Sequence, residues 1–227
     1  MFYSCASTYK EADVQIIPLL GIINDRDQEI SGMDWYKNNL ILLPENFDES
    51  KTYPLHLFLH GIGERGSDNK KQLTYINKVF SDKRNRKRFP AIVIFPQAPI
   101  TDSWSSRKLI KSPDNKNYRF KKNSIPTKSL SMVMRLMDSL VKISHINSNR
   151  VYLTGLSNGA MGSFELLNKR PDMFAAATLI CGAGHPDWVN NYAKNTALWI
   201  IHGSDDRVVH PCLLYTSPSP RDQRGGG

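Results

Sequence analysis

Cysteine is scarce in this 227-residue sequence, and long hydrophobic runs are missing from it. The three cysteines show neither paired spacing nor the spacing of a metal site, so we expect no disulfide framework and no bound metal or other cofactor. No apolar run approaches the length of a membrane span. The length and the 40% hydrophobic content instead fit one globular domain with a sizeable core.

Acidic residues are outnumbered by basic ones, 21 against 30, which gives a formal net charge of +9. Part of the excess is one short run: Lys83, Arg84, Arg86, Lys87 and Arg88. Such a run can mark an anionic partner, but no aromatic residues interleave with it as a nucleic-acid platform would require. We therefore interpret it as a solvated loop or helix end and expect no nucleic-acid partner.

The N-terminal 20 residues lack the basic start and apolar core of an intact signal peptide. Residues 2–7 resemble the end of a bacterial lipoprotein signal, which would require Met1 to be an internal methionine of a longer precursor. The localisation therefore stays open between the cytoplasm and, if the N-terminus is incomplete, export as a lipoprotein.

One stretch has a pattern that indicates chemistry. An apolar, β-prone run from Val151 ends at Gly155, Ser157 lies between Gly155 and Gly159, and a helix of small residues follows. This is G-x-S-x-G between a strand and a helix, the context in which the serine is lifted off the end of a sheet. The helix that begins near Asn158 would direct N–H groups and its positive dipole end toward the same point, which suits an oxyanion.

The rest of the chain alternates apolar strands with helical patterns. Because the strands are apolar on both faces, we expect an α/β fold with a mostly parallel sheet and helices on both sides. The expected helices span 72–80, 130–141 and 158–169, and residues 101–127 form a polar excursion over one end of the sheet. The expected strands span 39–43, 54–60, 91–95, 150–154, 174–181 and 197–202.

Reactive groups of such a sheet belong at the carboxyl ends of its strands. A serine hydroxyl needs a histidine to take its proton and a carboxylate to orient that histidine. The loop after His202 offers Asp205 and Asp206, and the loop after His60 offers backbone N–H groups beside that of Asn158.

With these motifs, the sequence resembles α/β-hydrolases of the phospholipase/carboxylesterase and dienelactone-hydrolase-like group, including bacterial "predicted peptidases" and feruloyl-esterase-like proteins. The resemblance implies Ser157 as nucleophile, Asp206 as acid, an oxyanion hole from Asn158 with Ile62 or Gly63, and Gln97 and Trp104 along the substrate. It spans residues 44–211 and rests on these segments: Tyr53-Pro54-Leu55, Phe58 to Gly66, Phe95 to Pro99 with Trp104, Gly155 to Gly159, and His202 to Asp206.

The catalytic histidine of the family should follow Asp206 by a few tens of residues, and it is missing. His185 precedes the acid, and His210 is too close to Asp206 to reach Ser157. Residues 212–227 resemble the translation of a sequencing adapter. We thus expect an N-terminal segment at 1–38, an α/β-hydrolase domain at 39–211 that lacks its last strand and helix, and a non-native, disordered tail at 212–227.

The sequence-based hypothesis is a serine hydrolase that cleaves small carboxylic esters through an acyl-enzyme. We expect this fragment to be inactive because the catalytic histidine is missing. One alternative is a serine peptidase of the prolyl-oligopeptidase-like type, which uses the same machinery on amides. A second is a non-catalytic binding protein that kept the fold. The sequence does not indicate the oligomeric state.

Overall fold

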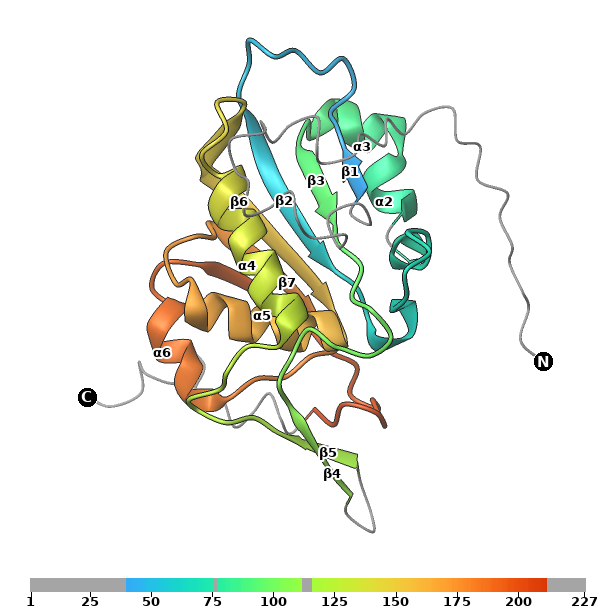
Figure 1. The fold of residues 1–227 in the computed structure, drawn as a ribbon, viewed down its shortest axis with the longest axis vertical. Helices are drawn as coiled ribbons and strands as arrows, with labels where there is room; N and C mark the ends of the chain where they lie inside the picture. The colour runs from blue at the N-terminus through green and yellow to red at the C-terminus, as the bar shows by residue number, and fades with distance from the viewer. Residues whose placement is uncertain (1–39, 76, 112–115, 212–227) are drawn as a thin grey trace, which may run out of the picture.

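The computed structural model describes residues 40–75, 77–111 and 116–211 (Figure 1). They contain a six-stranded sheet with the strand order β1-β3-β2-β6-β7-β8, in which β1 is antiparallel to β3 and every other neighbouring pair is parallel. The strands are β1 Leu40–Leu42, β2 Tyr53–Leu59, β3 Ile92–Phe95, β6 Ile146–Leu156, β7 Ala176–Ile180 and β8 Ala197–Ile201. The expected strands are thus all present, with ends displaced by a few residues.

Helices lie on both faces of this sheet, as its two-sided apolar strands predict. The helices α4 (Lys128–Leu140), α5 (Asn158–Lys169) and α6 (Val189–Tyr192) pack with one face into the larger core cluster. On the other face, α2 (Asn77–Ser81) adds Phe80 to a smaller cluster with Phe58, Val93 and Phe95. Figure 1 shows α4 and α5 crossing the same side of the sheet.

Two segments differ from the sequence-based expectation. The single helix expected over 72–80 is divided into a 3-10 turn, η5 (Lys71–Leu73), and the short helix α2. The basic run forms a helix of its own, α3 (Lys83–Arg88), because the Asp82 carboxylate caps it by accepting the N–H groups of Arg84 and Asn85.

The polar excursion contains a two-stranded hairpin, β4 (Lys108–Lys111) with β5 (Lys116–Arg119). Figure 1 shows this hairpin projecting at the end of the sheet where the parallel strands finish. The expectations for the N-terminal segment 1–38, for the tail 212–227 and for a strand and helix beyond β8 concern parts of the chain outside the described residues.

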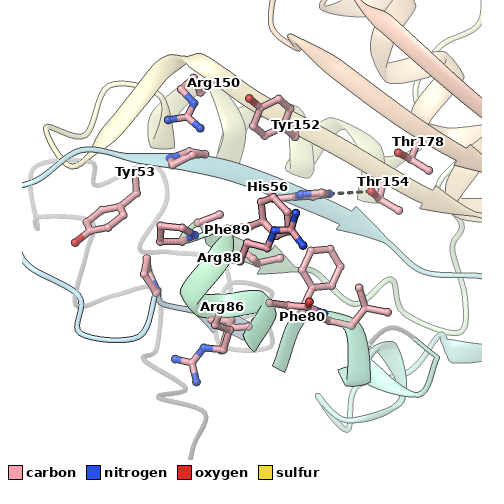
Figure 2. Close-up of a pocket in the computed structure, with 18 of the residues that line it drawn as sticks. Tyr53, His56, Phe80, Arg86, Arg88, Phe89, Arg150, Tyr152, Thr154 and Thr178 are labelled. Carbon is pink, nitrogen blue, oxygen red and sulfur yellow. Dashed lines mark hydrogen bonds between the residues drawn. The ribbon is translucent and has the colours of Figure 1, made fainter. Parts of the chain in front are cut away.

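The strand β8 and the sheet face beside it carry exposed apolar side chains. Trp199 is 68% exposed, and Ile200 and Ile201 are 43% and 39% exposed. A hollow of about 1100 Å³ lies on the face that also carries α2 and α3, and its lining includes Phe80, His56, Tyr152, Trp199 and Ile201 (Figure 2). Ser157 is not among the residues that line this hollow.

Candidate active site

Ser157 occupies the sharp turn between β6 and α5 that its sequence context predicts. Its backbone has φ 53° and ψ −112°, a conformation that a residue with a side chain rarely adopts. The Ser157 N–H donates to the Ile180 carbonyl at 2.8 Å, which ties the turn to the end of β7. The strained backbone and its location are those of a nucleophile elbow.

The residue after the serine, Asn158, is the first residue of α5, so its N–H has no acceptor within the helix. Its side chain is buried, with 1% exposed, and its Oδ1 accepts the Trp104 N–H at 3.2 Å. This contact fixes the start of the helix against the excursion loop. The Asn158 N–H thus lies at the helix start directly after Ser157, and its role as an oxyanion donor stays a prediction.

The loop after β2 contains the second expected pair of donors, in the 3-10 turn η4 (Ile62–Glu64). His60 orients the first peptide of this loop. Its Nε2 accepts the Ala98 N–H at 3.0 Å, so its Nδ1 carries the proton and donates to the Gly61 carbonyl at 2.6 Å. Burial lowers the pKa of His60 to about 4, which keeps the ring neutral as this hydrogen-bond pattern requires.

Glu64 adds a negative charge to the same loop. Partial burial raises the pKa of its carboxyl group, and the N–H groups of Gly61 and Glu64 that bind the carboxylate oppose this shift. Ile62 and Gly63 are both exposed residues. The candidate donors of this loop therefore belong to its exposed part.

Asp206 lies in the loop after strand β8, which pairs with β7 at the edge of the sheet. Its Oδ1 accepts the N–H groups of Val208 at 2.8 Å and Val209 at 2.9 Å. Burial works to raise the pKa of Asp206, but the hydrogen bonds from Val209 and Val208 outweigh it, so the pKa lies below its usual value. The Cys181 thiol also hydrogen-bonds this carboxylate, which a sequence pattern could not reveal.

The Asp206 loop and the Ser157 turn are separated by one strand, β7. The Cys181 N–H at the end of β7 donates to the Ile201 carbonyl at 2.8 Å. In the same way, the Ser157 N–H donates to the Ile180 carbonyl. Asp205, by contrast, is exposed. Of the two neighbouring aspartates, Asp206 is thus the one whose carboxylate is held by backbone N–H groups.

We expect Asp206→Asn to lower kcat about 10³–10⁴-fold in the active protein, because an amide cannot stabilise a catalytic imidazolium. Asp205→Asn should leave kcat within a factor of two, since its side chain is exposed. Steady-state hydrolysis of p-nitrophenyl acetate by both variants measures the difference. Equal losses would show that the acid has been misassigned.

Five of the six histidines make hydrogen bonds away from Ser157. His56 binds the Thr154 hydroxyl, His145 the Glu49 carbonyl and His185 the Asp187 N–H, while His60 braces the Gly61 loop. The fifth, His202, binds the Val209 carbonyl at 2.7 Å and lies 3.5 Å from the Asp206 carboxylate. His202 therefore braces the acid loop, and none of these five supplies a base to the serine.

Gln97 and Trp104, which were expected along the substrate, are both buried in the structure. Gln97 is 1% exposed and braces loops: its amide donates to the Glu64 carbonyl at 3.1 Å and accepts the Asn69 N–H at 2.8 Å. Trp104 is fully buried against the His60 ring, with the ring centroids 5.0 Å apart. Gln97 therefore braces the loop after β2, and Trp104 packs against the His60 ring that orients this loop.

Sequence reasoning missed a buried carboxylate on the nucleophile helix. Glu165 is fully buried and accepts hydrogen bonds from Ser124 at 2.7 Å, from the Ser106 hydroxyl at 3.1 Å and from Ser105 at 3.4 Å. These contacts fasten the excursion loop to α5. A charged residue on the buried face of a predicted helix was the available sequence signal.

Two histidines with lowered pKa values predict how stability depends on pH. Burial lowers the pKa of His56, as of His60, to about 4 from an ordinary 6.5. The unfolded chain therefore binds more protons than the folded chain between these values, and stability must fall as the pH drops from 6.5 to 4. Each ring contributes up to about 3 kcal/mol, because one pKa unit corresponds to about 1.4 kcal/mol.

Urea unfolding between pH 7 and pH 4.5 measures this slope. His56→Gln should reduce it by about half, since it removes one of the two titrating rings while retaining a partner for Thr154. The matched control is Ser148→Ala, at an exposed residue that does not titrate in this range, which should leave the slope unchanged. An unaltered slope in His56→Gln would contradict the assignment.

Within the described residues, no helix combines the length and apolar character needed to cross a bilayer. In the same part of the chain, no group of three or more His, Cys, Asp or Glu side chains is arranged to hold a metal ion.

Comparison with known proteins agrees with this geometry. Residues 116–207 match the model of the prolyl oligopeptidase family. A solved thermostable esterase is 34% identical, with a TM-score of 0.66 over 78% of this chain and 45% of its own. An acetyl xylan esterase from Aspergillus awamori is 17% identical, with a TM-score of 0.55 over 79% of this chain and 71% of its own.

A putative dipeptidyl aminopeptidase IV from Bacteroides ovatus shares the fold at 16% identity, with a TM-score of 0.50 over 78% of this chain and 27% of its own. No curated protein sequence matches the chain significantly. The chain spans less than half the length of the thermostable esterase. It is therefore an α/β-hydrolase-fold protein, similar to esterases and to peptidases of the prolyl oligopeptidase family.

Proposed function

We propose that this sequence belongs to a serine hydrolase that cleaves carboxylic esters through an acyl-enzyme. The observation that carries the proposal is the backbone of Ser157, strained to φ 53° at the strand end that the Asp206 loop and the Gly61 loop also flank. In this proposal Ser157 attacks the ester carbonyl. The N–H of Asn158, with that of Ile62 or Gly63, stabilises the oxyanion, and Asp206 orients the base.

Esters are favoured over amides by the thermostable esterase, which is the more similar of the compared structures at 34% identity. Peptide hydrolysis is the second candidate, favoured by the match of residues 116–207 to the prolyl oligopeptidase family. The two reactions share the same nucleophile and oxyanion donors. They differ in the leaving group, because an amine must be protonated before it departs and an alkoxide is expelled more easily.

The proposal includes an imidazole as the base, a role that none of the five histidines placed above fills. We propose that the natural reading frame supplies it after Asp206 and that the 227-residue chain, in which adapter-like residues follow Pro211, hydrolyses esters only weakly. A residual acceleration of about 10³–10⁴-fold over water is what the remaining groups of such a site provide.

The test compares the product of the natural reading frame with the 227-residue chain. We expect the former to hydrolyse p-nitrophenyl acetate and butyrate at least about 100-fold faster, in kcat/KM, than matched p-nitroanilides. A fluorophosphonate probe should label it on the tryptic peptide that contains Ser157. Faster anilide cleavage would establish the peptidase instead, and a folded protein without labelling would refute the hydrolase.

A further inference from the structure

The motif Gly61 to Gly66 contains two charged side chains, Glu64 and Arg65, and the contacts of Arg65 converge on the loop that carries the candidate oxyanion donors. Its Nε donates to the Ile62 carbonyl at 2.9 Å. Its Nη1 donates to the carbonyls of Ile100 at 2.9 Å and Asp102 at 3.1 Å. One guanidinium therefore joins the loop after β2 to the loop after β3.

The contact with Ile62 fixes more than that residue. The Ile62 carbonyl and the Gly63 N–H belong to one planar, trans peptide, in which the two groups point in opposite directions. An anchored carbonyl therefore sets the direction of the N–H on the other side of the same plane. Space around Gly63 is open, since a Cβ placed there would meet no atom within 4 Å, so packing does not supply this constraint.

Neighbouring carbonyls of the loop are held in the same way by other groups. His60 holds the Gly61 carbonyl at 2.6 Å, and the Gln97 amide holds the Glu64 carbonyl at 3.1 Å. Arg65 is therefore the anchor for the peptide between Ile62 and Gly63, which lies between those two held carbonyls. Its charge also polarises that peptide, which strengthens the N–H as a donor.

We propose that Arg65 is a positioning residue that aims the Gly63 N–H at the oxyanion formed when Ser157 attacks. The proposal rests on the proposed function, and it assigns Gly63 as the loop donor. A lysine cannot take this role, because its ammonium is a single point, whereas the Arg65 contacts leave from two nitrogens of a rigid fork.

The first test is kinetic and uses Arg65→Ala and Arg65→Lys in the product of the natural reading frame. Loss of one oxyanion donor costs about 10²–10³-fold in kcat, so a misaimed donor should cost about 10–100-fold with little change in KM. N-ethylguanidinium at millimolar concentration should restore part of the kcat of Arg65→Ala. Arg150→Ala, at an exposed arginine near the start of β6, is the matched control and should keep wild-type kcat.

A merely structural role would lower the melting temperature of both Arg65 variants while leaving kcat and the affinity for a trifluoromethyl ketone unchanged well below that temperature. The ketone forms a tetrahedral adduct with the serine, so its affinity should fall in step with kcat if Arg65 aims the donor. Unchanged kcat and ketone affinity in folded variants would overturn the proposal.

The second test does not require turnover. The Gly63 amide resonance in a ¹⁵N-labelled 227-residue chain should shift and broaden in Arg65→Ala, because the peptide loses its anchor, and remain at its wild-type position in Arg150→Ala. An unmoved Gly63 resonance would refute the positioning role. If the wild-type enzyme hydrolyses no ester, the proposed function is refuted. The Gly63 resonance would still decide whether Arg65 positions this peptide.

Discussion

Replacement of Ser157 by alanine should reduce ester hydrolysis by about 10⁵–10⁶-fold in kcat, the loss typical of removing a nucleophile that acts together with its base. The physical reason is that the acyl-enzyme route requires a covalent bond to the Ser157 oxygen, which alanine lacks. Stopped assays with p-nitrophenyl acetate and fluorophosphonate labelling both measure this loss. Labelling should disappear entirely.

The same position should show a conflict between activity and stability. Ser157 is held at φ 53°, a conformation that costs a residue with a Cβ about 1–3 kcal/mol and costs glycine little. Ser157→Gly should therefore unfold at a higher urea concentration than Ser157→Ala, by about 1 kcal/mol, although both are inactive. This order is expected if the fold tolerates the strain in order to present the hydroxyl.

The control is Ser204→Ala, which removes an exposed hydroxyl from the loop that contains Asp206. It should retain activity and labelling, since that loop is fastened through the Asp206 carboxylate and His202. Persistent labelling of Ser157→Ala at another residue would show that a different nucleophile acts. Equal stability of the alanine and glycine variants would show that the turn stores no strain.

The sequence predicted the elements that depend on local patterns. The strand-turn-helix around Ser157 follows from an apolar run, two glycines and a periodic helix, and α5 ends at Lys169 as expected. The expected fold class and the position of the Ser157 turn are both found. These features need only the periodicity and the steric demands of neighbouring residues.

Features that depend on contacts between distant segments were harder to predict. The arginine in Glu64-Arg65-Gly66 gave no sign that it would bind carbonyls of Ile100 and Asp102, more than 30 residues away along the chain. Trp104 and Gln97 were expected beside the substrate because the family resemblance implied it. Only the packing shows that both are buried braces.

The glycine after the nucleophile should be the least replaceable residue of the elbow. A Cβ at Gly159 would overlap the Leu59 carbonyl oxygen, and it would lie 2.5 Å from the Leu59 carbonyl carbon and 2.7 Å from the His60 oxygen. All three atoms are backbone of β2 or of the residue that follows it. They cannot move without breaking the pairing of β2 with β6, which supports the site.

Gly159→Ala should therefore destabilise the fold by about 3–5 kcal/mol, above the usual range for an overpacked core, or prevent folding altogether. The cause is space alone, because no described glycine has a positive φ. Gly203→Ala is the matched control: its Cβ would meet no atom within 4 Å, and its stability should stay within about 0.5 kcal/mol of wild type. Urea unfolding followed by circular dichroism measures both, and a Gly159→Ala variant as stable as Gly203→Ala would mean that α5 does not press against β2 as the structure places it.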